Sequence, residues 1–364
     1  MPLIVDSHQD LAWNMLSYGR DYTRSVVETR KLEAGTYVPD ANGESLVGWP
    51  EYQRGQVAVV FSTLYATPAK KKEPSDTLWY ADSEKAHRLY MDQIMVYRKL
   101  VDSHPDKFRH VTSLKELDSV IDHWSRPAVN GEGHPVGLVY LMEGGDGIRS
   151  PHELAEWYDL GLRLIGLAWA GTRYCGGTGE PGPLTPEGRE LIAAMADYNF
   201  ALDLSHMDEA AARESLDRYE GPVLASHANC AALLKDADTN RHLSDHIIEG
   251  LIERDAVIGL IPLNTFLKVG WLRKSGSRRE EVHLDALIAH IDHICQIAGD
   301  SLHAGIGSDF DGGFGLQSIP PEIDSIADLQ VVGSGLKARG YGDADVENIL
   351  GGNWLRFLRR VLPS

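Results

Sequence analysis

Eight short apolar runs, rich in β-branched residues, recur along the chain and are separated by longer segments of helical periodicity. The runs are residues 3–5, 57–65, 136–142, 162–168, 200–205, 222–226, 256–263 and 303–308. The clearest helical segments between them are residues 83–103, 186–198, 208–218, 243–255 and 284–299. Strands that alternate with helices form parallel sheets, and eight such units predict an α/β fold, a (β/α)8 TIM-like barrel. A doubly wound open sheet is the main alternative.

The chain is predicted to form one domain over residues 1–364, because no short repeat, low-complexity segment or break in composition marks a boundary. Its hydrophobic share of 43% is ordinary for a globular protein that builds a core. The less regular stretch from about residue 20 to 54 is expected to be an elaborated loop after the first strand.

Charge and cysteine usage limit the partners and the compartment. The net charge of −18 argues against a nucleic-acid partner, which would require a positive surface. Cys175, Cys230 and Cys295 lie far apart and form no disulfide framework, which favours a reducing compartment. The first residues, MPLIVDSHQD, lack the pattern of a signal peptide, and no run of about 18 apolar residues suggests a membrane span. A cytoplasmic protein without a membrane partner is therefore predicted.

A metal-binding or acid–base residue follows most of the predicted strands. These residues are His8 and Asp10 after the first strand, Glu143 after the third, His206 after the fifth, His227 after the sixth and Asp309 after the eighth. Each has a structural alternative when taken alone, such as a helix cap for His206 or a core histidine for His227. The carboxyl ends of all barrel strands share one face, however, so the six side chains are expected to meet there.

Three histidines together with carboxylates suit a divalent ion, zinc foremost, and a glutamate between two ligand groups can bridge two ions. Such a pair lowers the pKa of a water molecule between the ions, so that hydroxide is available near neutral pH. A further carboxylate can take up the proton of the water and return it to a leaving amine. The chemistry of this set therefore predicts a hydrolase.

The chain resembles the membrane (renal) dipeptidase family of zinc metallopeptidases, which belongs to the amidohydrolase-like barrels. The matching segments are DSHQDLAW (6–13), RGQVAVVFSTLYA (54–66), LMEGGDGI (141–148), LDLSHMD (202–208), ASHANC (225–230), NRHLSD (240–245), GIGSDFDG (305–312) and ILGGNWLR (349–356). The resemblance implies a dipeptidase with two Zn²⁺ ions per chain, other divalent ions being an alternative. It assigns one ion to His8 and Asp10, the second to His206 and His227, and the bridge to Glu143.

The resemblance also implies roles beyond ion binding. Asp309, the first aspartate of SDFD, matches the catalytic acid–base, and Arg241 matches the arginine that grips the terminal carboxylate of the substrate. A planar, permanently charged guanidinium suits this task. The alternative for Arg241 is a solvated charge just before a helix. Asp311 is interpreted as a structural residue.

The sequence departs from the family pattern after the fourth strand. Many members of the family have a histidine there that contacts the scissile group, whereas this chain reads LAW and has Trp169. Trp169 is predicted to contact the substrate, with packing in the core as the alternative. Arg173 is the candidate for the missing hydrogen-bond donor. The Gly- and Pro-rich segment 170–188 is expected to be a loop that either walls the pocket or projects from the surface.

The sequence predicts a hydrolysis reaction but is compatible with several substrates. A small dipeptide is the predicted substrate, and an N-acyl amino acid, a lactone or a ring amide is the alternative, because the same metal pair serves all of these reactions. A barrel that keeps the ions for structure or binding is the second alternative, but it would not need a free carboxylate beside an open coordination position. A homodimer is compatible with the sequence.

Overall fold

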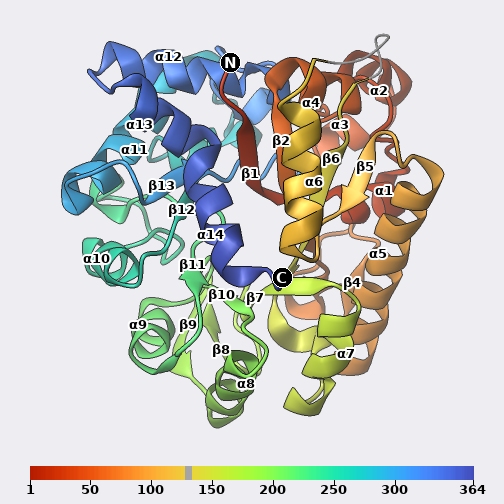
Figure 1. Cartoon of the computed structure of the whole chain (residues 1–364), viewed down its shortest axis with the longest axis vertical. Coiled ribbons are helices and arrows are strands. Elements are labelled where there is room, and N and C mark those ends of the chain that lie inside the picture. Colours follow the sequence, from red (N-terminus) through yellow and green to blue (C-terminus); the bar gives the residue numbers. More distant parts are fainter. Residues whose placement is uncertain (128–132) are drawn as a thin grey trace.

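The eight apolar runs each form a strand, and the strands are parallel neighbours in chain order around a barrel (Figure 1). The computed structural model describes residues 1–127 and 133–364. The barrel strands are β1 (Ile4–Gln9), β2 (Val57–Leu64), β6 (Val136–Glu143), β7 (Leu162–Gly166), β10 (Ala201–Asp203), β11 (Val223–Leu224), β12 (Ile258–Leu260) and β13 (Ala304–Ile306).

The barrel is nearly closed. β1 pairs with β13 at Asp6 and Ile306, and a single bridge between Ala225 and Ile258 joins the end of β11 to β12. The inward and outward faces of these strands are both buried, as expected for parallel strands that are covered by helices. The predicted (β/α)8 barrel is confirmed, and the open sheet is excluded.

Helices surround the barrel (Figure 1). They are α1 (Leu11–Tyr18), α5 (Ser83–Ser103), α6 (Leu114–Trp124), α7 (Leu154–Asp159), α8 (Pro186–Ala196), α9 (Glu209–Arg218), α10 (Asp245–Glu253), α11 (Leu284–Ala298), α12 (Gln330–Ala338), α13 (Asp343–Glu347) and α14 (Asn353–Val361). The start of α8 follows its sequence signal, because the side chain of Thr185 accepts a hydrogen bond from Gly188 N at 3.1 Å and Pro186 is the first helical residue.

The stretch between residues 20 and 54 is more regular than expected. It contains α2 (Val26–Glu33), α3 (Val38–Ala41) and α4 (Trp49–Gly55). Asp311, which is fully buried, attaches this insertion to the barrel: its carboxylate lies 3.0 Å from Arg20 Nη1 and accepts a hydrogen bond from Leu46 N at 2.8 Å. These contacts fit the structural interpretation of Asp311.

Five short strands had no signal in the sequence. β5 (Phe108–His110) pairs with the first residues of β6, before β7 begins to pair with β6 at Tyr140. The others form two small pairs, β3 (Thr67–Pro68) with β4 (Trp79–Tyr80), and β8 (Cys175–Gly177) with β9 (Glu180–Leu184). The last pair lies in the segment that was expected to be a loop, and it forms an antiparallel hairpin.

The C-terminal segment lies near the amino ends of the strands. The side chain of Asn199, just before β10, donates hydrogen bonds to the carbonyl groups of Arg360 and Val361 at 3.1 and 3.2 Å. A π-helical turn, Asn348–Gly352, precedes α14 and brings Gly351 so close to β1 that a Cβ atom would lie 2.5 Å from Leu3 O. The end of the barrel at the amino ends of the strands is therefore closed by packing. The carboxyl ends of the strands form the opposite face, where the functional site of such a barrel lies.

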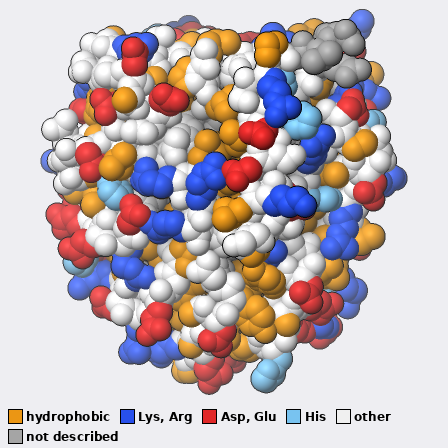
Figure 2. All heavy atoms as spheres, viewed as in Figure 1, with side chains coloured by type: hydrophobic (Ala, Val, Ile, Leu, Met, Phe, Trp, Pro, Cys, Tyr) orange, Lys and Arg blue, Asp and Glu red, His pale blue; other side chains and the backbone are white. Residues whose placement is uncertain are grey.

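The charged side chains on one face of the molecule are of both signs. On the face drawn in Figure 2, basic side chains lie among acidic ones and form no continuous basic surface. Over residues 1–127 and 133–364, no helix combines the length and the apolar character needed to cross a membrane.

Candidate active site

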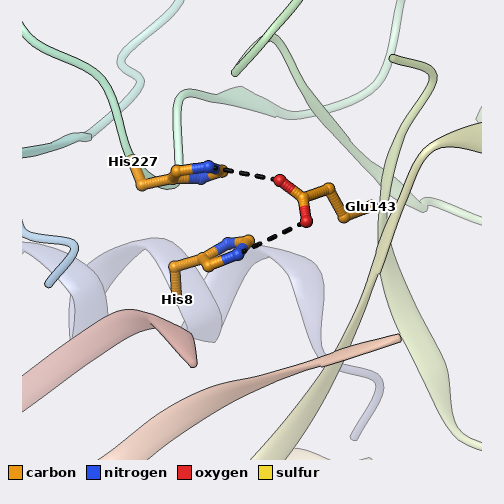
Figure 3. Close-up of side chains that lie close together, drawn as sticks. All are labelled: His8, Glu143 and His227. Carbon is orange, nitrogen blue, oxygen red and sulfur yellow. Dashed lines mark ion pairs between the residues drawn. The ribbon is translucent and has the colours of Figure 1, made fainter. Parts of the chain in front are cut away.

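The carboxylate of Glu143 lies between two imidazole rings at the carboxyl ends of the strands. Glu143 is the last residue of β6, His8 belongs to β1, and His227 follows β11. Glu143 Oε2 is 3.7 Å from His8 Nε2, and Glu143 Oε1 is 3.3 Å from His227 Nε2. Figure 3 shows the two oxygens directed to different rings. This is the arrangement that a bridging carboxylate requires.

His206 completes the group on the Oε1 side of Glu143. Its Nε2 atom is 3.1 Å from Glu143 Oε1 and 2.9 Å from His227 Nε2. His206 has a positive φ of 64°, a left-handed conformation that is uncommon outside glycine and often marks functional sites. The helix cap considered for His206 is instead supplied by Asp208, whose side chain accepts a hydrogen bond from Ala210 N.

Two aspartates complete the group on the His8 side. Asp10 Oδ2 and Asp309 Oδ1 lie 3.7 and 3.9 Å from His8 Nε2. Asp10 occupies the N-cap position of α1, but its side chain makes no capping hydrogen bond and is turned to His8 instead. Asp309 has a positive φ of 56°, and its backbone N–H donates to His8 O at 3.2 Å. The six residues predicted from the strand ends therefore lie together.

The electrostatics of the cluster favour a cation. Burial raises the pKa of Glu143 well above its ordinary value. Burial opposes the charge of His8, yet the carboxylates of Glu143, Asp10 and Asp309 raise its pKa to about 10. Burial, together with the positive charge of Arg241 and His8, lowers the pKa of His227 well below its ordinary value, so this ring is neutral. Without a cation, His8 must carry a proton to balance the carboxylates.

The donor atoms fit divalent ions. His8, Glu143 and His227 form one group, and His8, Asp10 and Asp309 form another, with the ligand atoms of each group within 4.8 Å of one another. His8 Nε2 and Asp10 Oδ1 are buried and have no hydrogen-bond partner among the described residues, which is costly unless another group binds them. Neutral imidazoles and carboxylates are the ligands that zinc takes in catalytic sites.

Arg241 is buried near the cluster and is not the solvated charge considered as its alternative. Only 3% of its surface is exposed. Its Nη2 atom donates to His227 O at 2.6 Å, whereas Nε and Nη1 have no partner within residues 1–127 and 133–364. Burial lowers its pKa to about 10, which leaves the guanidinium charged at neutral pH. Two unpaired donors on a buried cation suit an incoming carboxylate.

Trp169 is partly exposed and belongs to an aromatic row beside the cluster. Its ring centroid is 5.3 Å from that of Tyr65 and 6.2 Å from that of His206. A side chain that packed only in the core would be buried on both faces. The position next to a candidate ligand favours substrate contact.

The β8–β9 hairpin borders the same cluster. Thr178, at the turn of the hairpin, has its Oγ1 atom 3.0 Å from His206 Nδ1, and Gly177 forms a β-bridge with Met207. The segment 170–188 therefore walls the site and does not simply project from the surface.

The expectation that Arg173 supplies a donor at the reacting carbonyl is not supported. Its Nη2 atom donates to the carbonyl groups of Ile148 and Arg149 at 2.7 and 2.6 Å, and its Nε atom lies 3.7 Å from Glu187. These contacts hold the guanidinium against the loop after β6. The direction of a long side chain in a glycine-rich segment depends on tertiary contacts that the sequence does not reveal.

A layer of polar residues behind the histidines was not recognised from the sequence. Asp203 in β10, Ser205 and Ser226 are almost completely buried and hydrogen-bond to one another and to His227. The available signal was Asp203 itself, a charged residue within the apolar run FALDLS.

The sequence matches a known protein family over almost its whole length. The sequence profile of the membrane dipeptidase family (Peptidase family M19) matches residues 1–362. Dipeptidase tcpJ of Claviceps purpurea is 25% identical over 314 residues, which cover 85% of this chain and 67% of that protein.

Solved structures share the fold over almost the whole chain. The dipeptidase AC, a metallopeptidase of family M19, has a TM-score of 0.78 and 23% identity, covering 100% of this chain and 99% of its own. A metallopeptidase from Rhodobacter sphaeroides, solved with a phosphinate mimic of the dipeptide L-Ala-D-Ala, has a TM-score of 0.77 and 21% identity, covering 99% of each chain. The profile match extends over nearly all of the sequence, so this chain belongs to the membrane dipeptidase family, Peptidase family M19, and is a metal-dependent peptide-bond hydrolase.

Proposed function

We propose that this enzyme hydrolyses the amide bond of small dipeptides with two divalent ions per chain, zinc foremost. The observation that carries the proposal is the position of Glu143, whose two carboxylate oxygens face two separate groups of ligands. His8 and Asp10 would hold one ion, His206 and His227 the other. When bound, the ions would lower the pKa of a water molecule between them and polarise the scissile carbonyl.

The residues of the chain would orient the substrate and move the proton. Asp309 lies beside His8 and is the carboxylate placed to take up a proton from the attacking water and to return it to the leaving amine. Burial raises the pKa of Asp309, which suits a group that must both accept and release a proton near neutral pH. Arg241 would bind the terminal carboxylate through Nε and Nη1, the donors left without a partner in the part of the chain that the structure describes.

The substrate class is supported by the buried cation and by a relative. The R. sphaeroides metallopeptidase of the same fold was solved with a mimic of a dipeptide. A dipeptide has a terminal carboxylate at a fixed distance from a single amide bond, so one cation beside the cluster can select it. N-acyl amino acids have the same carboxylate and are therefore the competing substrates, ahead of lactones and ring amides.

A metal-reconstituted activity screen tests the function. We expect free dipeptides to be hydrolysed with a higher kcat/KM than N-acyl amino acids, lactones or ring amides, and activity to be lost after chelation and restored by Zn²⁺ or another divalent ion. Hydrolysis of N-acyl amino acids but not of dipeptides would contradict the dipeptidase proposal while leaving the metal chemistry in place.

Substitution of Arg241 tests the carboxylate clamp. We expect Arg241→Ala to raise KM for free-acid dipeptides on the order of 10²-fold, because a buried charge-assisted pair is lost. The matched substrates are the same dipeptides with an amidated C-terminus, for which little change is expected. Equal losses on both sets would show that Arg241 stabilises the fold near His227 and does not bind the carboxylate.

Substitution of Trp169 tests its contact with the substrate. A tryptophan provides a broad apolar wall, so Trp169→Ala is expected to reduce kcat/KM about 10-fold or more for dipeptides with bulky apolar side chains, and much less for Gly-Gly. The measurement is kcat/KM for both substrates together with the melting temperature. A uniform loss accompanied by a lower melting temperature would assign the ring to the core.

Other expectations from the sequence stay predictions. They are the single domain over residues 1–364, the cytoplasmic location and the homodimer.

A further inference from the structure

One serine hydroxyl lies behind histidines of both ligand groups. Ser226 Oγ is 2.8 Å from His227 Nδ1 and 3.4 Å from His8 Nδ1, and Ser226 is fully buried. These Nδ1 atoms belong to the rings whose Nε2 atoms face Glu143. The direction in which Ser226 shares its single proton therefore favours one tautomer of His227, whose Nε2 atom also lies 2.9 Å from His206 Nε2 and 3.3 Å from Glu143 Oε1.

Asp203 determines the direction of that hydroxyl. Asp203 Oδ1 accepts hydrogen bonds from Ser226 N at 2.8 Å and from Ser205 N at 3.0 Å, which fixes the carboxylate so that Oδ2 receives the Ser226 hydroxyl. Ser205 Oγ is farther from Ser226 Oγ, at 3.3 Å. Ser226 therefore donates its proton to Asp203 and offers lone pairs to the histidines.

We propose that Asp203 and Ser226 are positioning residues that keep the proton of His227 on Nδ1, so that Nε2, which lies 2.9 Å from His206 Nε2, keeps its lone pair for an ion. The use of this tautomer for ion binding rests on the proposed two-metal function, whereas the tautomer itself does not. His8 is held by the same hydroxyl over a longer contact. The hydrogen bond of the distal nitrogen orients the ring and sets the tautomer of a metal-binding histidine.

Asp203→Asn is expected to reverse the direction of the hydrogen bonds that join residue 203, Ser226 and His227. The two backbone N–H groups keep the amide oxygen at the Oδ1 position, because they would repel an amide NH2 there. The NH2 group must then face Ser226 and donate to its oxygen. Ser226 in turn donates to His227 Nδ1, which moves the imidazole proton to Nε2 and removes the ligand lone pair.

The tautomer can be measured directly in the metal-free protein by ¹⁵N-histidine NMR, with His227 assigned as the signals lost in His227→Gln. We expect a neutral Nδ1–H tautomer for His227 in the wild type and an Nε2–H tautomer in Asp203→Asn. In the double variant Asp203→Asn/Ser226→Ala, no hydroxyl joins residue 203 to His227, so the change to the Nε2–H tautomer should disappear.

Metal affinity provides a second readout. We expect Asp203→Asn to weaken binding of one ion about 10- to 100-fold and the other less, as the loss of such supporting partners usually does. Ser226→Ala should have a smaller effect, because it leaves Nδ1 without a partner but does not force the proton to Nε2. Ser62→Ala is the matched control, since Ser62 is a buried barrel serine whose hydroxyl has no partner in the described parts of the chain.

The outcomes separate this inference from the proposed function. An Nε2–H tautomer for His227 in the wild type, or an unchanged tautomer in folded Asp203→Asn, would overturn it. If Asp203→Asn does not fold, the inference is tested by the tautomer of His227 in the wild type and in Ser226→Ala. We expect a single Nδ1–H tautomer in the wild type and a mixture of the two tautomers in Ser226→Ala. An Nδ1–H tautomer in a protein that does not hydrolyse dipeptides would contradict the proposed function alone.

Discussion

Asp309→Asn is expected to lower kcat on the order of 10²-fold or more while leaving the fold and the metal content nearly unchanged, since a positioned acid–base is lost. Asparagine has the same shape, and it tolerates the left-handed backbone (φ 56°) that Asp309 adopts. The expected loss is therefore one of proton transfer and not of structure. The measurement is kcat for a good dipeptide substrate, together with elemental analysis of the same sample.

Asp311→Asn is the matched control, because Asp311 stands two residues later in the same SDFD motif and is also left-handed (φ 65°). Its carboxylate lies 3.0 Å from Arg20 Nη1, and this contact stabilises the insertion after β1. We expect a loss of about 1–3 kcal/mol in the free energy of unfolding, with kcat nearly unchanged. An active Asp309→Asn enzyme would assign proton transfer to another group.

Glu143→Gln is expected to have the largest effect of all. One oxygen of Glu143 faces His8 and the other faces His206 and His227, so an amide nitrogen deprives one group of its oxygen in either orientation. We expect about one ion to be lost per chain and kcat to fall on the order of 10³-fold, which corresponds to about 4 kcal/mol of transition-state stabilisation. The measurement combines metal content and turnover.

Glu51→Gln controls for the removal of a buried carboxylate elsewhere. Glu51 is fully buried in α4, accepts a hydrogen bond from Val26 N at 3.1 Å and pairs with Arg54. Its substitution is expected to lower stability without changing the number of bound ions. If Glu143→Gln kept both ions and full turnover, the bridging role would belong to another residue.

The barrel could be predicted because its strands are buried on both faces. Such strands read as continuous apolar runs, for example VGLVYLM in β6, and this signal is local. β5 and the β8–β9 hairpin could not be predicted, because their sequences, FRH, CGG and EPGPL, contain no apolar run and are rich in residues that rarely occur in strands.

The positions of the candidate ligands could be predicted for a similar reason. Parallel strands end at one face, so polar residues at strand ends meet without any knowledge of packing. The hydrogen bonds that support the candidate ligands could not be predicted in this way. The hydrogen bond of Thr178 to His206 and the alignment of Asp203 with Ser226 depend on the rotamers and the close approach of separate strands, and no single segment contains that information.

The central claim is that Glu143 joins two ion sites in one cluster, and the number of bound ions tests it most directly. Elemental analysis of metal-saturated, extensively dialysed protein should give about two divalent ions per chain in the wild type. His206→Ala and His227→Ala should retain the ion held by His8 and Asp10 and lose the other. A value of one ion or none in the wild type would contradict the bridged pair.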